Sequence, residues 1–448
     1  MRHNHKAWLP FFLFGLGSQM QIIASLSFTD LFVLLAAPLI FTSEYPILRR
    51  NGVSTAFWLA ILMMIGCAIA CVANHTAFAY VLRGMATTCI LPCAIVVCHW
   101  LLRKNMNGFK WILVGAIFSQ LLSTYFFQKS IEVNQFGGGV AGEEAVEGIK
   151  SGTLFLMSRI CPIVSLPAVG WYLQCPQLYC ILAPLFNCGL ILATTVSGRS
   201  AVVASLAGVF FLLIGGKKRY TMRRIGKYFW GFVIAGLIGV VAVSQLYRTA
   251  AMSGWMGEEA YQKYMAQTKG KKGVLAILMG GRMEFFCGLF ACLEKPIVGF
   301  GPWAADTKGY ALDFLSKYGD AEDYEHYLVR TEIEMRNGGR RLIPAHSHII
   351  GSWLNFGILG LIFWLYVLYV LFRYLKQDCW AIPQWYNWNV AALPSFLWAI
   401  FFSPFGDRIS PAMVIVACLL VRAVRQGKIT LPPEMQMEIA KVEGTRRG

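Results

Sequence analysis

Stretches of about 18–20 apolar residues recur from one end of this chain to the other, and this is the length that a helix needs to cross a bilayer. Only 14% of the 448 residues are charged and 57% are hydrophobic. A soluble domain has about a quarter of its residues charged, so this chain lacks the polar surface that a soluble fold would need. The pattern predicts an all-α polytopic membrane protein.

The apolar runs between polar breaks predict about twelve membrane-spanning helices. They cover residues 8–25, 28–43, 53–72, 77–101, 111–128, 153–173, 178–196, 199–215, 228–247, 347–374, 384–403 and 409–424. Basic residues precede the first run, but no small-residue cleavage site ends it. We therefore expect the first span to be retained rather than removed as a signal peptide.

One polar segment, residues 248–345, is large enough to fold on itself. It has mixed charge, aromatic residues and helix-like stretches such as 273–295. We expect a structured helical cap rather than a linker. The predicted organisation is an N-terminal bundle of about nine spans (1–247), the cap (248–345), C-terminal helices (346–428) and a tail (429–448).

The net charge of +17 is concentrated in short connections between spans. Lysines and arginines in short loops mark the cytoplasmic side of a membrane protein. The loops and tail that carry them all fall on one side if the N-terminus is cytoplasmic: Arg49, Arg50, Arg103, Lys104, Lys110, Lys217, Lys218, Arg219, Arg223, Arg224, Lys227, Arg373, Lys376, Arg422, Arg425 and Lys428. The charge thus predicts topology and contact with membrane lipids, not a nucleic-acid partner. Both termini are expected on the cytoplasmic side of the membrane, and the cap on the outer side.

Neither the cysteines nor the acidic residues form a convincing metal-site pattern. Most of the thirteen cysteines lie inside apolar runs and are predicted to be small buried hydrophobes. Cys287 and Cys292 lie in the cap, where their pairing stays open. The acidic run at residues 320–325 is expected to be solvated. The sequence has no phosphate-binding loop, so we expect no nucleotide cofactor. Without a convincing metal-site pattern we also expect no metal, and no other cofactor is expected.

Ionisable residues inside or beside a span are candidates for function, because burying one without a partner costs several kcal/mol. The topology puts six of them near the outer face: Arg83, Arg159, Arg199, Arg282, His346 and Arg408. Guanidiniums around one cavity suit a diphosphate, since each donates paired hydrogen bonds. A histidine beside them can exchange a proton near neutral pH. The alternative for Arg83, Arg159 or Arg408 taken singly is contact with lipid headgroups; His348 and His326 are predicted to be surface or structural groups.

Three segments resemble signatures of the O-antigen ligase and O-antigen polymerase superfamily. In the first, His346-Ser347 is followed by nine residues and then Gly357-Ile358-Leu359-Gly360, a spacing that selects His346 over His348. The second is the helix start at 197–201, where Ser-Gly-Arg-Ser stands in place of the family's Ser-Arg-Gly-Ala. The third is Gly281-Arg282-Met283-Glu284, followed by Lys-Pro-Ile-Val-Gly-Phe-Gly-Pro at 295–302. The order of the motifs and the topology carry the resemblance.

The resemblance implies a GT-C-like membrane fold and an enzyme of lipopolysaccharide biosynthesis. A ligase of this kind moves O-antigen from undecaprenyl diphosphate to a sugar hydroxyl of lipid A–core on the periplasmic face. His346 would be the general base, Arg199 and Arg282 would stabilise the departing diphosphate, and Arg83, Arg159 and Arg408 would help to bind it. The transfer would be metal-independent and inverting.

Other functions stay open. An O-antigen polymerase shares the motifs and differs in its acceptor, a second carrier-linked repeat unit. A transferase that glycosylates proteins is a third member of the same group. A lipid-linked oligosaccharide flippase would also use intramembrane arginines, but should spread them through the depth of the membrane.

Overall fold

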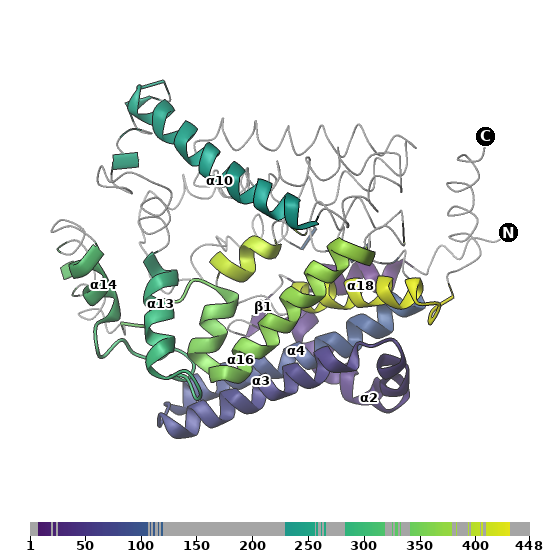
Figure 1. Ribbon diagram of the computed structural model, residues 1–448. Helices are drawn as coiled ribbons and strands as arrows, with labels where there is room; N and C mark the ends of the chain where they lie inside the picture. Colours follow the sequence, from purple (N-terminus) through teal and green to yellow (C-terminus); the bar gives the residue numbers. More distant parts are fainter. Residues whose placement is uncertain are drawn as a thin grey trace, which may run out of the picture.

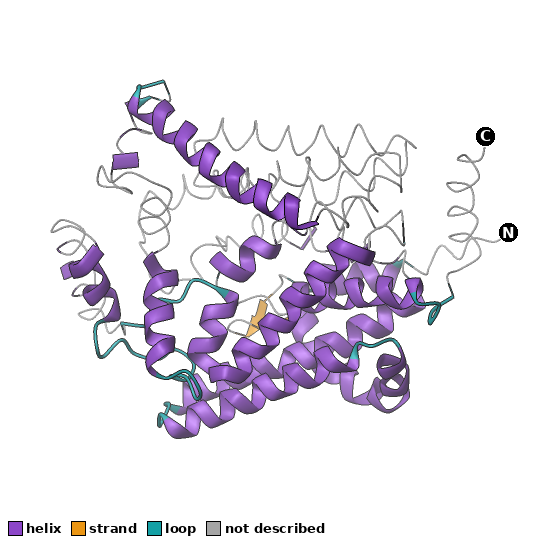
Figure 2. Cartoon of the chain, viewed as in Figure 1, coloured by secondary structure: helices purple, strands orange, loops and turns teal. Residues whose placement is uncertain are grey.

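The computed structural model describes a helical chain with one small β-hairpin (Figure 2). The residues that it describes are 8–18, 21–23, 26–105, 108, 111–112, 115, 118–119, 229–255, 257–258, 261, 264–265, 283–318, 325, 328–329, 332, 341–378, 382, 393, 396–403, 405 and 409–430. Within these ranges, four helices are long and apolar enough to cross a membrane. This supports a membrane protein built of helices, while the full number of twelve spans stays a prediction.

The four candidate spans belong to one bundle. They are α2 (Phe28–Arg50), α3 (Ser54–Ala73), α4 (Phe78–Lys104) and α16 (His348–Arg373), which η2 (Tyr374–Asp378) extends as a π-helix. The first three run antiparallel through short turns, so α4 packs against both α2 and α3. The long part of α16 lies along α3, and α18 (Ile409–Arg425) packs on α4 (Figure 1).

The start of the chain differs from the predicted spans. The predicted helix at 8–25 is wrong, because α1 covers only Leu9–Leu16 and a hairpin of β1 (Gln21–Ile23) and β2 (Leu26–Ser27) follows it. Eight residues of helix rise only about 12 Å, too little to cross a bilayer. Ser27 then caps α2 reciprocally with Asp30, and the helix runs on to Arg50 rather than to residue 43. Residues 26–30 therefore form a strand of the hairpin and the cap of α2, not a simple loop between two spans.

Gly357 divides α16 into two arms, within the candidate span His348–Asp378 that corresponds to the predicted span at 347–374. Its φ of +67° lies in the left-handed region, which favours glycine. Across the break, the indole Nε1 of Trp364 donates to the Ser352 hydroxyl at 2.7 Å. In a straight helix twelve residues rise about 18 Å, so the arms His348–Phe356 and Ile358–Arg373 fold back toward each other (Figure 1).

Two described helices, α13 (Met283–Glu294) and α14 (Tyr310–Tyr318), lie within the predicted cap. Helix α10 (Phe229–Met252) continues five residues past the expected end at 247. Helix α13 packs against α16, and α14 packs against α13 on the side away from the bundle (Figure 1).

Basic helix ends gather at one end of the bundle. Arg50 at the end of α2 donates from Nη2 to the Lys428 carbonyl at 3.4 Å, and Arg425 at the end of α18 pairs with Asp378 at 2.7 Å. The opposite end of α3 meets the 295–301 loop, where Asn74 Nδ2 donates to the Gly299 carbonyl at 3.1 Å. The described residues thus separate a basic end of the bundle from the end that contacts the 295–301 loop.

Candidate functional site

The site is built around the first turn of α16. Ser347 is fully buried and caps the helix: its hydroxyl accepts from the Ile350 N–H at 3.2 Å and donates to the Ile400 carbonyl at 2.9 Å. A serine with extended backbone is a favoured N-cap, because its oxygen satisfies an N–H that lacks a helical partner. The residue before it, His346, is therefore held at a fixed point where the helix starts.

His346 lies beside a carboxylate. Its Nδ1 is 3.4 Å from Oε2 of Glu284, on the first turn of α13. The separation is longer than an ordinary hydrogen bond and within ion-pair distance. The two side chains are 27% and 39% exposed, so the pair borders solvent rather than lying in the core.

The position of Glu284 determines which ring nitrogen of His346 carries the proton. A carboxylate next to Nδ1 favours the imidazole form that carries its proton there, which leaves a lone pair on Nε2. The same carboxylate stabilises the imidazolium that forms when Nε2 takes a proton. A histidine held in this way can serve as a general base toward a hydroxyl group.

Close packing at Gly288 brings Glu284 to His346. A Cβ placed on Gly288 would lie 2.9 Å from Ile350 Cγ2 and 3.0 Å from the Pro344 carbonyl oxygen, so α13 approaches the 344–350 segment more closely than any larger residue would permit. Cys292, five residues along α13 from Cys287, packs its thiol 3.6 Å from the Ile350 carbonyl. The small residues on this face of α13 thus allow the helix to lie close to residues 344–350, which brings Glu284, one turn before Gly288, next to His346.

A loop clasps the break in α16. The Phe300 N–H donates to the Leu354 carbonyl at 2.7 Å, and the Ile358 N–H donates to the Ile297 carbonyl at 3.0 Å. A Cβ on Gly357 would lie only 2.1 Å from that Ile297 oxygen, and Gly299 has a φ of +76°. The Lys-Pro-Ile-Val-Gly-Phe-Gly-Pro segment and the Gly357 motif are therefore two halves of one contact.

A second set of contacts joins residues 304–306 to the 341–343 segment, which leads to the start of α16. Buried Asp306 caps α14 by accepting from the Tyr310 N–H at 2.8 Å, and lies 3.2 Å from Nη2 of Arg341. The backbone pairs too, with the Asp306 N–H donating to the Arg341 carbonyl and the Ile343 N–H to the Ala304 carbonyl. These contacts fix the segment that leads directly into His346.

The cysteines near the site are not reactive groups. Cys287 and Cys292 are both free and fully buried, so the open question of their pairing is answered: they form no disulfide in this structure. Burial raises the pKa of each thiol to about 12. Thiols in this state are protonated at neutral pH and behave as small apolar side chains.

The structure describes two of the six predicted site residues. His346 lies against Glu284, whereas Arg83 is exposed on α4, next to the contact of Gly84 with Pro302. Arg159, Arg199, Arg282 and Arg408 lie outside the described residues, as does His326. Their convergence around His346 stays a prediction.

His348 has a structural role, as expected. It is 6% exposed, its Nδ1 is 2.7 Å from the Ser403 carbonyl, and its ring packs against Trp364 and Phe405. Both histidine environments follow from the turn of one helix: Ser347 and His348 face the bundle, and His346 precedes the first turn.

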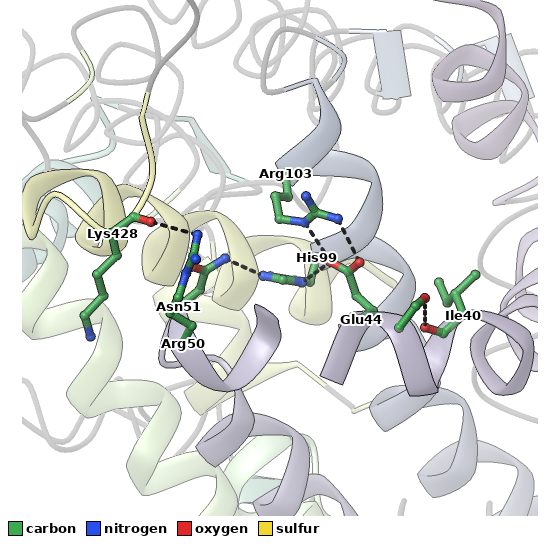
Figure 3. Close-up of polar contacts among 8 residues, drawn as sticks. Ile40, Glu44, Arg50, Asn51, His99, Arg103 and Lys428 are labelled. Carbon is green, nitrogen blue, oxygen red and sulfur yellow. Dashed lines mark hydrogen bonds and ion pairs between the residues drawn. The ribbon is translucent and has the colours of Figure 1, made fainter. Parts of the chain in front are cut away.

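Sequence reasoning missed two features. The first is Glu284, which belongs to the Gly281-Arg282-Met283-Glu284 segment. The sequence assigns it no role, because only folding brings it to His346. The second is a buried network at the basic end, where Arg103 donates two 2.9 Å hydrogen bonds to Glu44, whose Oε1 lies 2.8 Å from His99 Nδ1 (Figure 3). Asn51 meets His99 Nε2 at 3.0 Å. The sequence signal for this network is His99, an ionisable residue inside the fourth predicted span. Its contacts join α2 to α4.

A comparison with protein-family models finds no match, and a comparison with curated protein sequences finds none either.

Proposed function

We propose that this chain is a membrane glycosyltransferase of the O-antigen ligase type. The observation that supports the proposal most directly is the pairing of His346 with Glu284 at a partly exposed position, where a helix cap and two loop contacts hold the histidine. The contact between the 295–302 segment and Gly357 also gives a shared physical reason for two motifs of the resemblance.

The proposed step is a displacement at an anomeric carbon. Nε2 of His346 takes the proton of the acceptor hydroxyl as its oxygen attacks that carbon, and Glu284 stabilises the imidazolium that results. The bond from the carbon to the diphosphate oxygen breaks, and the diphosphate leaves with the electron pair. Arg199 and Arg282 are the proposed groups that stabilise its charge. Direct attack inverts the anomeric carbon.

In this proposal the donor is an undecaprenyl-diphosphate-linked glycan and the acceptor is a hydroxyl of lipid A–core. The carrier diphosphate is already activated, so no nucleotide is required. The lipid chain would lie among the apolar helices and the sugars beneath the cap. The chemistry would take place on the periplasmic face of the inner membrane.

The test is His346→Ala in a strain whose lipopolysaccharide depends on this chain. A ligase defect leaves core without any O-antigen and polymer retained on the carrier. A polymerase defect leaves core bearing a single repeat unit, which would replace the ligase proposal by its close relative. Unchanged lipopolysaccharide would overturn both.

A matched control separates loss of the base from loss of the fold. His75 is exposed in the α3–α4 connection and has a φ of +48°, a conformation that asparagine tolerates. His75→Asn should therefore keep full activity. Both variants should reach the membrane in wild-type amounts, measured by immunoblot.

A further inference from the structure

Three arginines surround one buried carboxylate at the basic end of the bundle. Asp378 ends η2 and is 1% exposed, and Nε of Arg425 lies 2.7 Å from its Oδ1. Arg373, in the last turn of α16, and Arg422, in the last turn of α18, also act electrostatically on this carboxylate. Among the residues that the structure describes, three positive charges face one negative charge, so the cluster has positive charge in excess.

The cluster also has unsatisfied donors. The Nε atoms of Arg373 and Arg422 are buried without a hydrogen-bond partner among the residues that the structure describes. Leaving a buried donor in this state is unfavourable. Both side chains are only partly buried, so a ligand at the surface of the bundle can reach their guanidiniums. An oxyanion that reaches these side chains would balance the excess charge and lie beside the unsatisfied donors.

The local fold makes the arrangement specific. The chain passes from α16 into the π-helix η2, a rare conformation that is common at functional sites. The Gln377 carbonyl in η2 accepts from Arg425 Nη1 at 3.2 Å, and Arg373 Nη1 donates to the Tyr369 hydroxyl at 2.8 Å. The guanidiniums of Arg373 and Arg425 are thus held in place, unlike arginines that reach freely into solvent.

We propose that Arg373, Arg422 and Arg425 bind the phosphate group of an anionic phospholipid between α16–η2 and α18. The cluster lies at an end of the bundle where candidate spans terminate, which is the depth of lipid headgroups. Basic pockets between spans at such a depth bind anionic headgroups. Arg50 and Lys428 at the same end add to the local positive potential. This site is independent of the glycosyltransferase proposal.

The test measures binding of phosphatidylglycerol to the purified, delipidated full-length chain by native mass spectrometry. Arg373→Gln with Arg422→Gln should weaken binding about 30-fold, since each surface arginine contributes about a factor of five. Arg373→Lys with Arg422→Lys keeps the charge and should still weaken binding about fivefold, because an ammonium does not replace a guanidinium fork. The lysine variant keeps the test decisive if the glutamine variant folds poorly.

The control is Arg50→Gln with Lys428→Gln, which removes the same charge at the same end. It should weaken binding about threefold or less, because the contact is screened and unspecific. Equal loss in the two glutamine pairs would mean general surface attraction and would overturn the site. Equal binding of inorganic phosphate at the same concentration would identify a soluble anion instead of a lipid. Absence of phosphatidylglycerol binding to the wild type would also overturn it.

Discussion

At the scale of single residues, the two neighbouring histidines of the 346–348 segment show how little separates a candidate base from a structural group. His348 is buried with a fixed carbonyl partner, whereas His346 is 27% exposed beside Glu284. The spacing to Gly357 selected the histidine that the fold leaves accessible. Glu284 is the group that the structure adds to it.

Glu284 should matter through His346. Glu284→Gln keeps the size of the side chain but removes the charge that stabilises an imidazolium, so transfer should slow about tenfold to a hundredfold. The measurement is the rate of glycan transfer by membranes that contain equal amounts of protein. Asp313→Asn, in the exposed pair with Lys317, is the control and should leave the rate unchanged. A fully active Glu284→Gln variant would contradict the role in orientation.

Cys287 and Cys292 should resist alkylation in the folded chain. Burial raises each thiol pKa from 9.0 to about 12, so about a thousandfold less thiolate is present than in the unfolded chain at pH 8. Their contribution to stability is complete below pH 9 and declines as the pH rises toward 12. Mass spectrometry after iodoacetamide treatment, with and without denaturant, measures the difference. Equal labelling rates in the two states would show that these thiols are accessible.

At the scale of secondary structure, the break in α16 decides where the site lies. A continuous helix would place the Trp364 indole about 18 Å from Ser352, whereas the two are hydrogen-bonded. The break leaves backbone groups without helical partners, and the Ile297 carbonyl and Phe300 N–H bind two of them. The first arm of α16 (348–356), the 295–302 loop and α13 therefore pack together as one unit.

Gly357→Ala should damage this unit. An alanine there must keep a φ of +67° and place its Cβ 2.1 Å from the Ile297 oxygen, which should cost about 2–4 kcal/mol of stability. Thermal unfolding in detergent and glycan transfer should both decline. Gly231→Ala on α10 would place its Cβ more than 4 Å from any other described residue, apart from the adjoining backbone of α10, and should be neutral or slightly stabilising. Similar unfolding curves for the two variants would show that the clasp is dispensable.

At the scale of the whole molecule, charge divides the bundle into two ends. Arg50, Arg103 and Arg425 end their helices on one side, while Asn74 and the 295–302 loop lie at the other end of α3. Positive residues favour the cytoplasm during insertion. The predicted topology would put the end that carries His346 and the cap on the outer side.

Reporter fusions test this orientation. Alkaline phosphatase, which is active only outside the cytoplasm, should be active when fused after residue 75 and inactive when fused after residues 105 or 428. A fluorescent protein that matures only in the cytoplasm should give the opposite pattern. The reverse result at all three positions would invert the topology and place His346 on the cytoplasmic side.

The sequence by itself determined the elements whose signal is local. A span is a continuous apolar run of sufficient length, so α3, α4 and α18 lie within a few residues of their predicted ranges. Basic loop charges are equally local, and they predicted the shared basic end. The predicted span at 8–25 was wrong for the same reason. Apolar content does not reveal that α1 ends at Leu16, or that Ser27 and Asp30 form the cap at which α2 begins.

Only the tertiary structure decided the contacts between distant segments. Nothing near Gly357 in the sequence shows that the 297–300 backbone will complete the broken helix, and nothing near Glu284 shows that His346 will lie 3.4 Å away. Asp378 likewise gains its arginines from two helices that are separate in the chain. Such pairs depend on how helices pack, and packing depends on the shapes of both partners at once.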